Sequence, residues 1–158
     1  MLARLLNIDY GKLSEGNLRL ARTLNFLLKF NLFAIPLYVM LVFDIQFSLL
    51  QSAVRDISFY TLNLLNFNPT LSGYLISIPV QNGNWAADIN WDCTGWKSMF
   101  AFAALVMASE RKMRAKAKGM LLFIPLIFAV NIARIIFMFY FVRTFDLAYY
   151  SFVHSFVW

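Results

Sequence analysis

The chain has 158 residues, which is enough for one domain. Hydrophobic residues make up 61% of it and charged residues 14%, whereas soluble domains are about 45–50% apolar and about 25% charged. This composition excludes the soluble globular classes and predicts an integral membrane protein. The single Cys and the single His rule out a disulfide within the chain and leave too few ligands for the usual zinc sites, so we expect no metal and no cofactor.

The N-terminal residues 1–25 contain four Lys and Arg but no apolar core and no small-residue cleavage site, so we do not expect a cleavable signal peptide. An apolar stretch then runs from residue 26 to residue 50, and Asp44 and Gln46 interrupt its outer part. About 20 apolar residues are needed to cross the hydrocarbon of a bilayer. We therefore predict that this stretch is an uncleaved signal anchor.

Residues 53–67 form a shorter segment that could either cross the membrane or lie on it. As a helix they would extend about 22 Å, which is less than the hydrocarbon thickness of about 30 Å. A crossing here would also place the basic residues 110–118 outside. We therefore expect an interfacial or re-entrant amphipathic helix on the outer face.

Strand-forming residues at 73–80 and 85–91 flank an Asn82-Gly83 pair, which is typical of a two-residue hairpin turn. Pro79 has no N–H for a ladder hydrogen bond, so its strand is expected at a sheet edge. We predict a small β-hairpin, with an irregular loop as the alternative. An exposed strand edge can accept a peptide by strand addition, although one turn signal does not establish such a site.

Two further apolar stretches follow, at residues 94–109 and 120–142. Five basic residues lie between them at 110–118, whereas residues 51–92 contain one. Because cytoplasmic loops are rich in Lys and Arg, we place 1–29 and 110–118 in the cytoplasm and 51–92 outside the cell membrane. The basic segments, which account for the net charge of +6, would then lie beside anionic lipid, so nucleic-acid binding is not expected. The expected fold is an all-α integral membrane protein, one membrane-embedded domain of about three to four helices with a short outer hairpin or loop.

Cys93 lies in the sequence WDCTGWKSMF, where the outer segment becomes a membrane span. With Asp92 as the N-cap, Cys93 would occupy the first helical turn, where the helix dipole favours the thiolate. Lys97 follows one turn later on the same face, and its charge would favour the thiolate further. We predict a reactive thiol at the water-accessible rim. The alternative is an inert, small apolar side chain.

Arg134 lies inside the third apolar stretch, where a charged side chain costs about 2.5–3.5 kcal/mol and indicates a functional site. Asn131 precedes it by three residues on the same helix face and could orient it. By helical rise, Cys93 and Arg134 lie about 24 Å and about 22 Å above the cytoplasmic ends of their helices. Two antiparallel helices would thus bring the thiol and the guanidinium to one depth. A snorkelling Arg is the alternative.

His154 is the only His of the chain and follows the third apolar stretch on the outer side. A Cys nucleophile, a His acid or base and an Arg that stabilises an oxyanion form a complete set for acyl transfer. An interfacial side chain is the alternative for His154. Asp44 is a second costly charge in an apolar stretch, and it could pair with Arg134 or Lys97.

In this order and spacing, the residues resemble the exosortase/archaeosortase transpeptidases. The match comprises WDCTGWKS around Cys93, a span, a basic loop, NIARI around Arg134 and then His154. The family pattern is a Cys followed after one residue by Gly, an Asn-x-x-Arg in the next long helix and an outer His. Residues 1–90 match only in character. Members usually continue through further helices, so this chain would be either a minimal member or one that lacks a last helix.

The resemblance implies a membrane cysteine transpeptidase whose nucleophile is Cys93, with Arg134 as the stabiliser of negative charge and His154 as the acid or base. Such enzymes cleave the C-terminal signal of exported proteins, which carries a short motif, a transmembrane helix and a basic cluster. A lipid or another surface acceptor then takes the new C-terminus from the acyl-enzyme. Hydrolysis without an acceptor stays open. A non-catalytic membrane assembly or substrate-binding subunit is the competing hypothesis.

Overall fold

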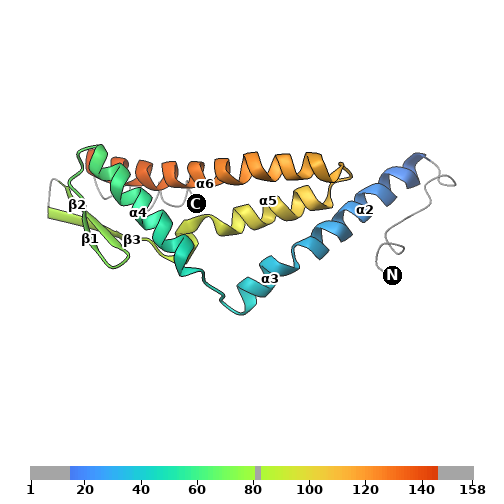
Figure 1. Ribbon diagram of the computed structural model, residues 1–158, viewed down its shortest axis with the longest axis horizontal. Coiled ribbons are helices and arrows are strands. Elements are labelled where there is room, and N and C mark those ends of the chain that lie inside the picture. The colour runs from blue at the N-terminus through green and yellow to red at the C-terminus, as the bar shows by residue number, and fades with distance from the viewer. Residues whose placement is uncertain (1–14, 81–82, 146–158) are drawn as a thin grey trace. The chain divides into compact units, whose positions relative to one another are not determined.

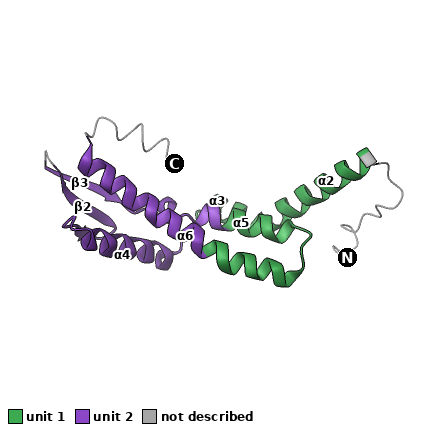
Figure 2. Cartoon of the chain, turned by 90° about the horizontal axis from the view of Figure 1, so that it is seen from above, with its two compact units in different colours: residues 1–44, 100–124 green, residues 45–99, 125–158 purple. Residues whose placement is uncertain are grey.

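The computed structural model describes residues 15–80 and 83–145 (Figure 1). They divide into two compact units, which Figure 2 colours separately. Unit 1 contains residues up to 44 together with 100–124, and unit 2 contains residues 45–99 together with those from 125 onward. Helices dominate both units, and unit 2 also contains a small β-sheet.

In unit 1, a bent pair of helices corresponds to the predicted first span. Helix α2 (Glu15–Phe33) is followed by helix α3 (Ile35–Val42), and the two are bent by 43°. Pro36 stands in the first turn of α3, where its missing N–H and its ring interrupt continuous helix. The pair is long and apolar enough to be one broken span. It begins before residue 26 and ends before residue 50, so the predicted boundaries were wrong at both ends.

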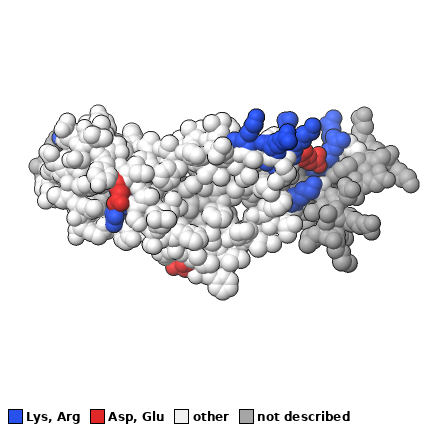
Figure 3. Space-filling model, viewed as in Figure 1, with Lys and Arg blue, Asp and Glu red and all other residues white. Residues whose placement is uncertain are grey.

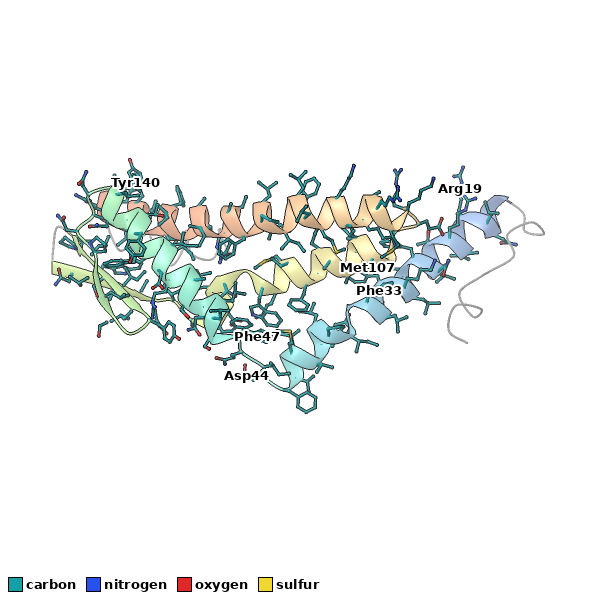
Figure 4. All side chains as sticks on the ribbon, viewed as in Figure 1. Arg19, Phe33, Asp44, Phe47, Met107 and Tyr140 are labelled. Carbon is teal, nitrogen blue, oxygen red and sulfur yellow. The ribbon has the colours of Figure 1, made fainter. Side chains whose placement is uncertain are left out.

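The remaining helical segments of unit 1 belong to α5 (Trp96–Ala108) and α6 (Met113–Thr144), whose other ends lie in unit 2. The ammonium of Lys116 donates a 2.6 Å hydrogen bond to the carbonyl of Met107, which is labelled in Figure 4. Lys and Arg side chains gather on this unit (Figure 3). Among the described helices, α6 is the one that is by itself long and apolar enough to cross a bilayer. Helix α5 has 13 residues and is too short to do so as a straight helix.

In unit 2, the predicted helix at 53–67 is present as α4 (Ser48–Leu64), which begins earlier and ends earlier than expected. Its buried residues Val54, Ser58 and Leu62 recur every four positions and therefore form one face. This face packs into the apolar core of the unit, together with residues of the sheet and of α6. The core residues are Val54, Leu62, Phe67, Ile76, Ile78, Ile89, Ile132, Ile135 and Phe139.

The predicted hairpin is present in unit 2 as β2 (Leu75–Val80) and β3 (Gly83–Asp88), which pair antiparallel. The predicted turn pair was wrong by one residue, because Gly83 already belongs to β3 and pairs with Val80. A further short strand, β1 (Thr70–Ser72), pairs with the other side of β2, so the sheet order is β1-β2-β3. The prediction that Pro79 puts its strand at an edge was therefore wrong for the strand as a whole. β1 pairs only with Leu75–Ser77, however, and Pro79 has its one partner, Asn84, on the β3 side. A missing N–H is tolerated there.

Candidate active site

Cys93 lies in a short 3-10 helix, η2 (Trp91–Thr94), in unit 2. The N-cap of η2 is Asn90, whose side-chain oxygen accepts the N–H of Cys93 at 3.1 Å. The prediction of Asp92 as the cap was wrong, because the chain turns two residues earlier. Asn is a preferred cap residue, and its position three residues before Cys93 is the signal that could have identified it.

Gly95 separates η2 from α5. Its φ of +74° is left-handed, which ends η2 and lets α5 begin at Trp96. Cys93 thus lies before the apolar helix rather than in its first turn. The rings of Trp91 and Trp96 stack at 5.3 Å across this break. Phe47, labelled in Figure 4 just before α4, contacts Trp91 edge-on at 5.9 Å. These aromatic contacts hold the turn that carries the thiol.

Asn131 on α6 ties this turn to the long helix. Its buried side-chain amide donates a 2.7 Å hydrogen bond to the main-chain carbonyl of Cys93. The same side chain lies so close to Gly95 that a Cβ there would be 2.9 Å from Cγ of Asn131. Only a Gly fits both the backbone angle and this approach. The Cys-x-Gly and Asn-x-x-Arg patterns therefore describe one packed contact.

Arg134 lies three residues after Asn131 on α6, and its side chain is half-buried. Arg134 and Cys93 line the same cavity of about 430 Å³. Ile135, Met138 and Phe139 complete the α6 wall, and residues 85–90 form the opposite wall. The structure thus brings together the thiol and the guanidinium, which lie 41 positions apart in the sequence.

The Cys93 thiol is partly buried, and its Sγ lies 3.8 Å from the main-chain carbonyl of Asp88 as a hydrogen-bond donor. Burial raises the pKa of this thiol above its usual value. The main chain of Asn90 and the charge of Arg134 oppose that rise, whereas the carboxylates of Asp88 and Asp92 add to it. The expectation that the site favours the resting thiolate was wrong, because loss of solvation outweighs the nearby cation.

Lys97 was expected to support the thiolate, but its ammonium binds the carboxylate of Asp92 at 2.8 Å. Both side chains are half exposed, so the pair contributes about 0–1 kcal/mol to stability. Asp44 belongs to unit 1, where it follows α3 with a φ of +48°, and its pairing with Arg134 or Lys97 stays a prediction. His154 lies outside the described residues.

Two features of the site were not anticipated from sequence. One is the Asn90 cap, and the other is the wall that the main chain around β3 contributes to the cavity. A search of the described residues finds no group of three or more His, Cys, Asp or Glu that could hold a metal ion. The titratable side chains that line the cavity are those of Cys93, Arg134, Asp88 and Asp92.

A family model described as Transmembrane exosortase (Exosortase_EpsH) matches residues 14–157, which include every residue that the structure describes. No curated protein and no solved structure matches the chain.

Proposed function

Because this chain belongs to the transmembrane exosortase family, we propose that it is a membrane cysteine transpeptidase or protease that cleaves the C-terminal sorting signals of exported proteins. The observation that carries the proposal is the shared cavity of Cys93 and Arg134. A thiol nucleophile and a cation at one cavity are two of the three groups that acyl transfer from a peptide uses, and an acid or base is the third.

In the proposed reaction, Sγ of Cys93 attacks the carbonyl carbon of the substrate peptide bond. The thiol proton passes to a base, for which we propose His154. The C–S bond forms, the C–N bond breaks, and the leaving amine takes the proton back from His154. The result is a thioester between Cys93 and the exported protein. A nucleophile from a lipid, another surface acceptor or water then attacks the thioester and releases the thiol.

Arg134 would stabilise the negative charge that develops on the carbonyl oxygen during both steps. Arg134 follows Asn131 by three residues on α6, and Asn131 is hydrogen-bonded to the turn that carries the thiol. The guanidinium and Sγ are thereby kept in fixed relation. We place this site at the outer boundary of the cell membrane, since the basic residues 110–118 lie at the other ends of α5 and α6.

The experiment that tests the proposal follows exported precursors in cells that carry variants of this chain. Cys93→Ala and Arg134→Lys should each leave uncleaved precursor in the membrane, because Lys cannot reproduce the planar guanidinium. Arg143→Lys is the matched control on the same helix, since Arg143 lies outside the cavity and binds the carbonyl of Asn66. A thioester between Cys93 and a cleaved protein should accumulate when acceptors are withheld. Normal processing in the Cys93→Ala strain would refute the proposal.

The raised pKa of Cys93 favours a second candidate, a non-catalytic assembly or substrate-binding subunit. In that case the thiol is a small, partly buried side chain, and Arg134 serves only in packing. Alkylation separates the two candidates. If a small alkylating reagent modifies Cys93 at a rate that rises with pH as the thiol is deprotonated, the result supports the enzyme. A Cys93 that does not react supports the subunit.

A further inference from the structure

The strand β3 is the last strand of the sheet, and within residues 15–80 and 83–145 no strand pairs with its other side. That side faces the cavity of Cys93 and Arg134, because residues 85–90 line it without interruption. The cavity therefore has one wall made of strand main chain. A strand edge of this kind presents N–H and C=O groups that another extended chain can pair with.

The register of the sheet identifies which groups these are. In an antiparallel pair, opposed residues alternate between those that bond to each other and those whose N–H and C=O point away. The ladder continues beyond β3 with Ile89, whose N–H donates to the carbonyl of Tyr74 at 3.0 Å. Counting back by twos, Ala87 and Trp85 also bond to β2. The main-chain groups of Ala86 and Asp88 consequently point outward.

Two independent observations agree with this assignment. The carbonyl of Asp88 accepts the Cys93 thiol at 3.8 Å, which requires it to point away from β2. Pro79, which has no N–H, stands opposite Asn84 in a pair that the same alternation leaves without hydrogen bonds. The outward carbonyl nearest the end of β3 is thus already directed at the sulfur.

We propose that the polypeptide substrate binds in extended form as a fourth strand along the outer edge of β3, with Ala86 and Asp88 as its main-chain partners and the cleaved bond at Cys93. This inference rests on the proposed function. If it holds, the cavity recognises its substrate largely through hydrogen bonds between the main chain of β3 and the main chain of the substrate. Specificity for particular residues then has to come from the substrate side chains that meet the cavity wall of α6.

The arrangement also sets the direction of the substrate. Trp85 packs against Phe139 at one end of the cavity, and Cys93 lies beside Asn131 at the other. Along α6, the Asn131 end is the one that continues into the long apolar stretch. The transmembrane helix that follows the cleaved bond has to leave from this end. The substrate residues that precede the cleaved bond then run parallel to β3, and the carbonyl of the last of them lies at Sγ of Cys93.

The test uses the full-length protein in detergent and measures alkylation of Cys93 by mass spectrometry. The probe is acetyl-trialanyl chloromethyl ketone, whose electrophile lies at the C-terminal end, and chloroacetone is the peptide-free reference. The ratio of the two rates reports peptide docking. We expect a ratio well above one for the wild type. Methylation of every peptide N–H should return the ratio to near one, because it removes the strand's donors.

On the protein side, Ala86→Pro removes one outward N–H without touching the bonds to β2. We expect it to lower the ratio about fivefold to tenfold, which is the effect of one lost hydrogen bond. Ala86→Val keeps the N–H and should keep the ratio. Asn84→Pro removes an outward N–H that lies outside the cavity, and it should have no effect.

The outcomes separate this inference from the proposed function. Equal ratios for the methylated and unmethylated peptides would overturn strand addition while leaving Cys93 as a nucleophile. If Ala86→Pro does not fold, the peptide pair on the wild type still decides the matter. Chloroacetyl-trialanine amide carries its electrophile at the N-terminal end. If only this peptide reacts faster than its peptide-free reference, chloroacetamide, the parallel direction is overturned. A Cys93 that reacts with none of the reagents would overturn the proposed function and this inference with it.

Discussion

The side-chain amide of Asn131 donates a 2.7 Å hydrogen bond to the main-chain carbonyl of Cys93, across 38 positions of sequence. This bond connects the long helix α6 to the turn that presents the thiol. Because Arg134 follows Asn131 by one helical turn, the same contact sets the position of the guanidinium relative to the sulfur. The geometry of the cavity therefore depends on a residue whose side chain need not touch a substrate.

The first prediction concerns the close approach of Gly95 to Asn131. Gly95→Ala should lower stability, because the left-handed backbone costs about 1–2 kcal/mol for a residue with a Cβ and the new methyl meets Asn131. Thermal unfolding in detergent measures the effect, and about 1 kcal/mol lowers Tm by about 2–4 °C in a chain of this size. Gly119→Ala is the control, since Gly119 lies in α6 with open space around it. A similar loss in both variants would contradict the prediction.

The second prediction concerns the hydrogen bond itself. Asn131→Leu keeps a side chain of similar size but removes the donor, so the Cys93 carbonyl loses its partner. We expect a loss of about 1–3 kcal/mol in stability, together with a fall in precursor processing. Asn31→Leu is the matched control, because Asn31 also donates to a main-chain carbonyl but does so on an exposed face. Stability unchanged in Asn131→Leu would show that the bond is dispensable.

The third prediction concerns the charge that opposes the raised pKa of Cys93. Arg134→Gln removes a cation that lowers the pKa of the thiol, so that pKa should rise further. Since the thiolate is the reactive form, the midpoint of the pH–alkylation curve should move to higher pH. Arg143→Gln removes an equal charge outside the cavity and should leave the midpoint in place. A midpoint that Arg134→Gln does not move would show that the two groups are electrostatically independent.

The fourth prediction has the opposite sign. Asp92 raises the pKa of Cys93, so Asp92→Asn should lower it and shift the alkylation midpoint to lower pH. The substitution also releases Lys97 from its ion pair, which acts in the same direction. Asp56→Asn is the control, because Asp56 pairs with Arg55 away from the cavity. A shift to higher pH would be incompatible with the arrangement of charges around the thiol.

Much of the local structure was predictable, because it depends on short stretches of chain. Apolar runs predicted the long helix α6, and the Asn82-Gly83 pair predicted the hairpin β2–β3. The short strand β1 was missed, since three residues carry no periodic signal of their own. The break beside Pro36 was missed and the start of α4 was placed too late, because element boundaries depend on packing as well as on composition.

The sequence by itself determined that this is a membrane protein of the exosortase family and which residues deserve attention as nucleophile and cation. The expectation that helical rise brings Cys93 and Arg134 to one depth stays a prediction, and it was counted from helix ends that the structure places elsewhere, since α5 begins at Trp96 and α6 at Met113. Only the tertiary structure decided how Cys93 and Arg134 meet. The Asn131 bond, the close fit of Gly95 and the β3 wall are contacts between segments far apart in the chain. The raised pKa of the thiol could not be predicted from the sequence, because it follows from burial by residues that are neighbours only in space.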